Sequence, residues 1–131
     1  MEPNERIQEA KRVMEAEAKA IYASSKKLDL NFSKCIDLII GCKGTIVISG
    51  IGKSGNIGKK ITSTLSSLGT PSIFLHTTDA FHGDLGTLRK NDLLILISNS
   101  GETSELIKLL EYAKSNGNKI IGITGHINST I

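Results

Sequence analysis

The sequence predicts an α/β protein, a three-layer αβα sandwich with a parallel sheet, on the strength of three observations. Short apolar runs rich in β-branched residues alternate with longer segments whose apolar residues recur at helical spacing. The runs are continuously apolar, which is typical of parallel strands covered on both faces by helices. Loops rich in glycine and hydroxyl groups follow the runs, as at the ligand-binding edge of such sheets. At 131 residues, the chain is expected to form a single domain.

Each expected element follows from local pattern. The four strands are expected at residues 45–49, 71–75, 93–97 and 119–123. The helices are expected from an N-cap at Asn4 through Ile21, at 32–40 before Gly41, with apolar positions from Ile57 to Leu68, and at 103–115. One short helical turn is expected within 79–86.

Composition excludes several function classes. The net charge of +3 is mild and the lysines are scattered, and aromatic residues make up only 4% of the chain, so neither a basic patch nor a base-stacking surface for nucleic acid is indicated. No segment has the length and purity of a membrane span, and the acidic N-terminus does not resemble a signal peptide, so we expect a cytoplasmic protein. Cys35 and Cys42 fit reduced thiols better than a disulfide framework or a zinc site.

The turn at residues 98–103 is the most informative segment. It carries Ser98, Asn99, Ser100 and Thr103 around Gly101, between an expected strand and an expected helix. Backbone N–H groups and the positive end of the helix dipole would face such a turn, so it can hold a phosphate. A plain helix cap by Ser100 or Thr103 is the alternative. Three hydroxyls and a glycine in six residues favour anion binding.

The loop at residues 50–55 satisfies G-x-G-x-x-G between a strand and a helix, which suggests a dinucleotide site. The strand that follows is succeeded by His76, without the acidic residue that would hold a ribose, which weakens the dinucleotide interpretation. A Walker A loop fails, because Val47 occupies the position of its leading glycine. The loop instead places Lys53 and Ser54 beside the hydroxyl-rich turn, where they can contact a phosphate.

A second loop, at residues 79–86, contains His82 between glycine-rich flanks. His76, Asp79, His82 and Asp84 are close in sequence, but their spacing matches no metal signature, so we expect no metal. His82 lies in a glycine-flanked loop and not on an apolar helix face, so a core histidine is the weaker interpretation of this residue.

Five segments in order resemble the sugar isomerase (SIS) domain, and most closely the arabinose-5-phosphate isomerases. They are residues 50–58, 69–72, 82–86, 97–102 and 122–125. The serine-rich turn by itself indicates only an SIS domain. The lysine-bearing first loop together with His-Gly-Asp-Leu-Gly is more specific to the isomerases. The resemblance covers nearly the whole chain.

The resemblance implies interconversion of D-ribulose 5-phosphate and D-arabinose 5-phosphate through an enediol, without a cofactor, in the supply of Kdo for lipopolysaccharide. It implies a phosphate site at Ser54, Ser98, Asn99, Ser100 and Thr103. It implies sugar-end roles for Lys53, His82 and Glu105, with Lys53 as an electrostatic clamp. Glu102 is expected to project from the same side of the helix start as Glu105, and catalysis and a dipole-favoured first-turn position remain equal interpretations for it.

The family's domain continues beyond the point that Ile131 matches, so the chain is expected to be the N-terminal portion of an SIS domain, without its last part and without the CBS pair that usually follows. Catalysis by these residues alone is therefore in question. A non-catalytic sugar-phosphate-binding module is the alternative function. An unpaired sheet edge and the apolar positions of the first helix predict self-association into a homodimer or homotetramer.

Overall fold

A computed structural model describes residues 2–81 and 83–131, in two compact units, Met1–Lys34 and Cys35–Ile131. The first unit contains helix α1 (Pro3–Ser25) and the start of α2 (Leu30–Ile40). The N-cap of α1 is Glu2, whose backbone N–H donates to the Glu5 carboxylate at 2.8 Å in a capping box. The predicted cap at Asn4 is therefore wrong, because Pro3 already occupies the first turn. No described helix is long and apolar enough to cross a bilayer.

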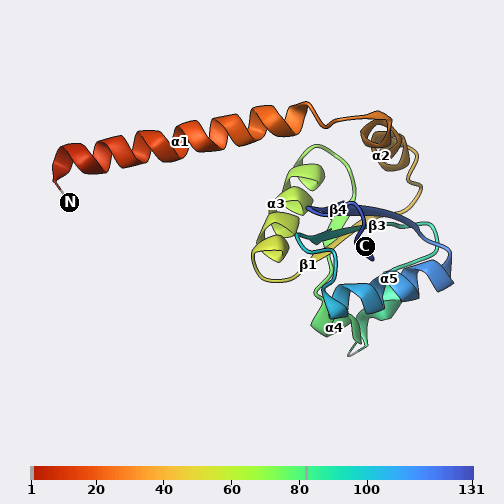
Figure 1. Cartoon of the computed structure of the whole chain (residues 1–131). Coiled ribbons are helices and arrows are strands. Elements are labelled where there is room, and N and C mark those ends of the chain that lie inside the picture. Colours follow the sequence, from red (N-terminus) through yellow and green to blue (C-terminus); the bar gives the residue numbers. More distant parts are fainter. Residues whose placement is uncertain (1, 82) are drawn as a thin grey trace. The chain divides into compact units, whose positions relative to one another are not determined.

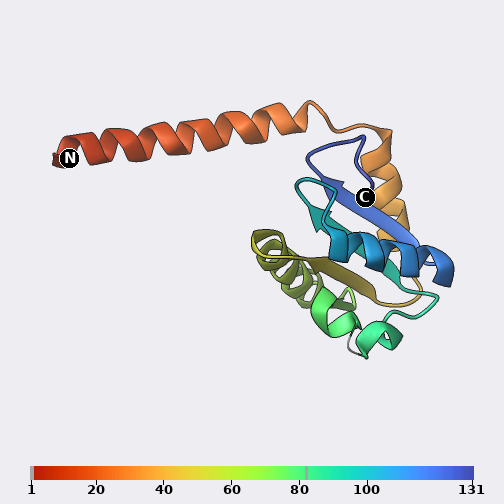
Figure 2. The ribbon, with the colours of Figure 1, turned by 60° about the horizontal axis from the view of Figure 1, so that its bottom comes forward.

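The second unit is built on four parallel strands, which confirms the predicted sheet. They are β1 (Ile46–Gly50), β2 (Ser72–Phe74), β3 (Leu93–Ser98) and β4 (Lys119–Thr124), in the order β2-β1-β3-β4. Figure 2 shows β3 and β4 side by side and pointing the same way. The apolar runs of the sequence locate every strand, because strands covered on both faces are apolar at successive positions.

Helices cover both faces of this sheet and complete the three predicted layers (Figure 1). Side chains alternate between the faces along each strand. On one face Val47, Leu94 and Leu96 pack with the buried side of α5 (Ser104–Asn116). On the other face Ile48 and Ile95 pack with Leu38 of α2 and with α3 (Lys53–Ser67). A short α4 (Thr77–Phe81) and a 3₁₀ turn (Asp84–Thr87) follow β2.

Helix α3 begins earlier than the apolar pattern predicts. Gly52 is its N-cap and adopts φ +59°, a conformation that favours glycine. A Cβ on Gly55 would lie 2.7 Å from the carbonyl oxygen of Gly50, so the helix start and the strand end approach too closely for side chains. Residues 53–55 therefore form the first turn of a helix and not part of a loop. The glycine pattern is explained by backbone packing without any dinucleotide.

The strand order places a topological switch point between β1 and β3. Gly50 at the end of β1 pairs with Ile97 in β3, one residue before Ser98. The chain leaves β1 toward one face through α3 and leaves β3 toward the other face through α5. The crevice opened by this divergence is where parallel α/β proteins bind ligands. Residues 50–55, which join the end of β1 to the first turn of α3, and the turn at residues 98–103 both lie at this point.

Candidate functional site

The turn after β3 is organised by its own hydroxyl groups. Ser98 is 3% exposed, and its Oγ lies 2.8 Å from Thr103 Oγ1 and accepts a hydrogen bond from the Gly101 N–H at 3.1 Å. Ser100 Oγ accepts from the Glu102 N–H at 3.1 Å. Thr103 is the N-cap of α5, yet its side chain makes no capping hydrogen bond to that helix. Ordinary side-chain capping therefore does not account for this cluster of hydroxyls.

A cavity of about 330 Å³ opens at the same edge of the sheet. The end of β1, the first two turns of α3, the start of α4 with the residue before it, and the start of α5 surround it. Its lining consists of Gly50, Ile51, Gly52, Gly55, Asn56, Lys59, His76, Thr77, Thr78 and Glu105. A cavity of this volume, with one carboxylate, one imidazole and one ammonium group at its wall, suits a small polar ligand.

Glu105 is the predicted site residue that lines this cavity. Its Oε2 accepts a hydrogen bond from Ser104 Oγ at 2.9 Å. The pKa of Glu105 is lowered, chiefly by a hydrogen bond with its own backbone N–H and then by the Ser104 hydroxyl and the charge of Lys108. This shift keeps the carboxylate in its ionised form to lower pH and makes it a weaker base than an ordinary glutamate.

Two cavity residues, His76 and Lys59, were not predicted from the sequence as site residues. The His76 ring meets the Phe74 ring edge to face, with centroids 4.9 Å apart. Lys59 Nζ lies 5.4 Å from the same Phe74 centroid, within the range of a cation–π contact. One signal was available: Gly52, Gly55 and Lys59 recur at helical spacing, and His76 directly follows a strand.

The remaining predicted residues lie at or near this edge with different surroundings. Lys53 is exposed at the first position of α3 and Ser54 is half-buried beside it, and neither lines the cavity. Asn99 and Ser100 are exposed in the turn after β3. His82 lies outside the described residues.

Glu102 does not share the direction of Glu105. Helix α5 starts at Ser104, so the prediction that both glutamates project from one side of the helix start is wrong. The Glu102 carboxylate accepts hydrogen bonds from the backbone N–H and the hydroxyl of Thr130, at 2.8 and 2.7 Å. Glu102 is also absent from the cavity wall.

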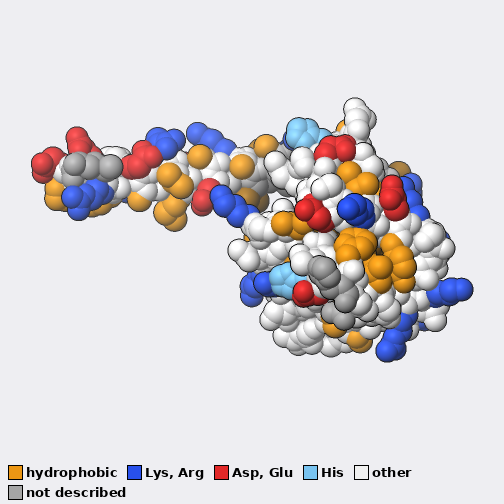
Figure 3. All heavy atoms as spheres, turned by 90° about the horizontal axis from the view of Figure 1, so that it is seen from below, with side chains coloured by type: hydrophobic (Ala, Val, Ile, Leu, Met, Phe, Trp, Pro, Cys, Tyr) orange, Lys and Arg blue, Asp and Glu red, His pale blue; other side chains and the backbone are white. Residues whose placement is uncertain are grey.

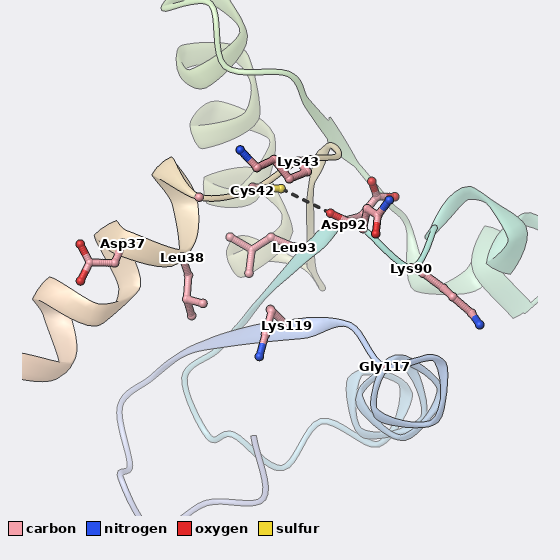
Figure 4. A pocket seen from close by; sticks show the side chains of 11 residues that line it. Asp37, Leu38, Cys42, Lys43, Lys90, Asp92, Leu93, Gly117 and Lys119 are labelled. Atoms are coloured by element: carbon pink, nitrogen blue, oxygen red, sulfur yellow. Dashed lines mark hydrogen bonds between the residues drawn. The ribbon is translucent and has the colours of Figure 1, made fainter.

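Another cavity, of about 310 Å³, lies at the opposite edge of the sheet, near the start of β3 and β4 (Figure 4). Leu38, Leu93 and Cys42 contribute to its wall, and the Cys42 thiol lies 3.7 Å from the carbonyl oxygen of Asn91. Among the residues that the structure describes, none of the predicted site residues lines it. Figure 3 shows acidic and basic side chains interspersed on one face of the molecule, without a large region of a single sign.

The fold and the serine-rich turn agree with a match to a known domain family. The parallel sheet has the strand order β2-β1-β3-β4 and carries a serine-rich turn at its switch point. Residues 38–131 match the family model of the SIS domain. The chain belongs to the SIS domain family.

Several individual proteins resemble the chain along most of its length. The chain is 52% identical, over 90% of its length, to a probable arabinose 5-phosphate isomerase of Haemophilus influenzae. It is 48% identical, over 95% of its length, to the arabinose 5-phosphate isomerase KpsF of an Escherichia coli strain. It spans 35% and 38% of the lengths of these two relatives. A solved structure of an E. coli CFT073 protein in complex with arabinose 5-phosphate superimposes with a TM-score of 0.92 at 41% identity, covering 98% of this chain and 69% of that one.

Proposed function

We propose that this chain carries the sugar-phosphate site of an isomerase that interconverts D-arabinose 5-phosphate and D-ribulose 5-phosphate. The observation that carries the proposal is the position of Glu105, whose ionised carboxylate lines a small polar cavity directly after the hydroxyl-rich turn at the switch point. The names of the relatives that are 52% and 48% identical support the same reaction.

The phosphate is assigned to the turn after β3 and to the start of α3. Ser98, Ser100 and Thr103 offer hydroxyl groups there, Asn99 offers its amide, and Ser54 lies in the first turn of the neighbouring helix. The first-turn backbone N–H groups of α5 and its dipole favour a dianion at this place. Anchoring the phosphate leaves the carbonyl end of a five-carbon sugar free to extend into the adjacent cavity.

The chemistry requires a proton to move between two adjacent carbons. A base takes the proton from C1 of ribulose 5-phosphate, the electron pair shifts to the C2 oxygen, and an enediol forms. Return of the proton to C2, with transfer of the hydroxyl proton from O1 to O2, gives the aldose. Glu105 is the proposed base, because its carboxylate lines the cavity.

Positive charge near the developing oxyanion lowers the barrier to this step. Lys53, at the first position of α3, is proposed for that role, and Lys59 offers an ammonium group at the cavity wall. His82 is proposed as a further group at the sugar end. No metal or organic cofactor is part of the proposal, because enolisation by a positioned base needs none.

The cellular setting completes the proposal. Arabinose 5-phosphate is the precursor of Kdo, a sugar of lipopolysaccharide, and we place the protein in the cytoplasm as a homodimer or homotetramer.

α1 buries none of its residues in its own unit, although Ile7, Val13, Met14 and Ile21 form an apolar set at helical spacing. A second copy of the chain is the proposed partner.

The test is an isomerisation assay in heavy water, monitored by NMR, on this chain and on the longest natural protein found to contain it. That protein should interconvert the two pentose phosphates without added metal. The sugar should take up deuterium from the solvent, because an enediol passes its proton through a base. Binding of arabinose 5-phosphate without turnover or deuterium uptake would instead identify a non-catalytic sugar-phosphate-binding module.

A further inference from the structure

The loops that follow β3 and β4 are fastened to each other. The Gly125 N–H donates to the Asn99 carbonyl oxygen at 3.0 Å, and the Ile131 N–H donates to the Gly101 carbonyl oxygen at 3.2 Å. Residues 125–131 thus run along the hydroxyl-rich turn. The conformation of that turn therefore depends on residues 125–131, which follow α5 and β4 in the chain.

Glu102 makes the polar side-chain contacts between these two loops. One carboxylate oxygen accepts from the Thr130 N–H at 2.8 Å and the other from the Thr130 hydroxyl at 2.7 Å. These bonds lower the pKa of Glu102, with the Thr130 hydroxyl as the larger cause and its backbone N–H as the second. Each oxygen of the carboxylate therefore has a donor in the same residue.

The packing of Gly101 indicates the same close association independently. Gly101 has φ +67°, and a Cβ at this position would overlap the Ser129 side chain. The backbone of the turn and residues 129–131 are in contact without room for a side chain between them. A shift of the second loop would therefore be transmitted directly to the backbone beside Ser98 and Ser100.

A direct bond then connects Glu102 to the proposed phosphate ligands. The Glu102 N–H donates to Ser100 Oγ at 3.1 Å, and the preceding Gly101 N–H donates to Ser98 Oγ at 3.1 Å. Fixing Glu102 through its side chain fixes the two amides that orient these hydroxyls. Its carboxylate faces Thr130 rather than the cavity that Glu105 lines.

We propose that Glu102 is a positioning residue, whose carboxylate clamps Thr130 and thereby holds the serine hydroxyls of the neighbouring turn in the arrangement that receives a phosphate. The clamp is a property of the fold, and its effect on affinity rests on the proposed function. Glu102 transfers no proton to the substrate. Its contribution is to hold a binding surface that the sugar phosphate finds already formed.

The first test measures the clamp without any ligand. Glu102→Ala and Thr130→Val should raise the amide hydrogen-exchange rates of Thr130 and Ile131, because the bonds that hold this segment are lost. Thr130→Ser keeps a hydroxyl and should leave them near the native rates. Glu111→Gln, at another exposed glutamate of α5, is the matched control. Equal exchange rates in Glu102→Ala and Glu111→Gln would overturn the proposal.

The second test measures the consequence, with inorganic phosphate and arabinose 5-phosphate as titrants. Glu102→Ala and Thr130→Val should each weaken binding about 3- to 10-fold, the range expected for loss of ordinary hydrogen bonds. The double variant should be no weaker than Glu102→Ala, because the two residues act as one contact. Additive losses, or native affinity in Glu102→Ala, would overturn the positioning role.

The two proposals fail in different ways. If the native chain and its longer product bind neither titrant, the proposed function fails, and the exchange rates still decide the clamp. If the longer product is active, Glu102→Gln should raise KM more than it lowers kcat. Loss of kcat at unchanged KM, with Thr130→Val fully active, would make Glu102 a proton-transfer residue and refute the proposal.

Discussion

Ser98→Ala is the most informative single substitution at the proposed phosphate site. Ser98 is 3% exposed, and its hydroxyl contacts Thr103 Oγ1 at 2.8 Å and the Gly101 N–H at 3.1 Å. Its removal deprives two buried or half-buried polar groups of a partner, so the free energy of unfolding should fall by about 1–3 kcal/mol. If the same hydroxyl binds a phosphate dianion, the affinity should also fall by about 1–3 kcal/mol, or roughly 5- to 150-fold.

Calorimetric titration with arabinose 5-phosphate and thermal unfolding separate these two effects. Ser100→Ala should lose affinity with a smaller loss of stability, because Ser100 is exposed. Ser115→Ala, an exposed serine at the far end of α5, is the control and should bind normally. Unchanged affinity in both Ser98→Ala and Ser100→Ala would refute the assignment of the phosphate to this turn.

Three further predictions concern catalysis and assembly. In a protein that contains this chain and isomerises the two pentose phosphates, Glu105→Gln keeps the shape but removes the base, and turnover should fall about a hundredfold or more in a steady-state assay, whereas Glu111→Gln should stay active. Lys53→Ala should lower turnover more than phosphate affinity if its charge serves the oxyanion, and the reverse ratio would assign it to the phosphate. Sedimentation at micromolar concentration should show a dimer or larger species, and replacing Ile7 and Ile21 by glutamine should weaken it; a native monomer would contradict this prediction.

Element type was predictable from local pattern, whereas helix starts were not. The four strands follow from apolar runs because burial on both faces demands them. The start of α3 at Lys53 was missed because its first turns carry Gly55 and Gly58 where the helical pattern expects apolar side chains. These glycines are buried by close approach to Gly50 and to the Phe74 ring, contacts that only the assembled sheet creates.

The site was predictable where it depends on one loop and one strand end. The turn at 98–103 was found because hydroxyls at the carboxyl end of a parallel strand have a physical meaning in the sequence. His76 and Lys59 were missed because what they share is contact with the Phe74 ring. Lys59 lies in α3 and Phe74 in β2, so this contact exists only once the helix packs on the sheet. The partner of Glu102 was missed because Thr130 lies 28 residues away and meets it only when β3 and β4 pair.

The proposed sugar-phosphate site lies at the switch-point edge of the sheet. An NMR titration of the chain with arabinose 5-phosphate tests it most directly, through the backbone amide shifts. Binding at this edge should give saturable shifts at residues 50–56 and 98–105, with residues 41–43 and 90–92 at the opposite edge unchanged. Shifts concentrated at that opposite edge, around the cavity of Cys42, would contradict it.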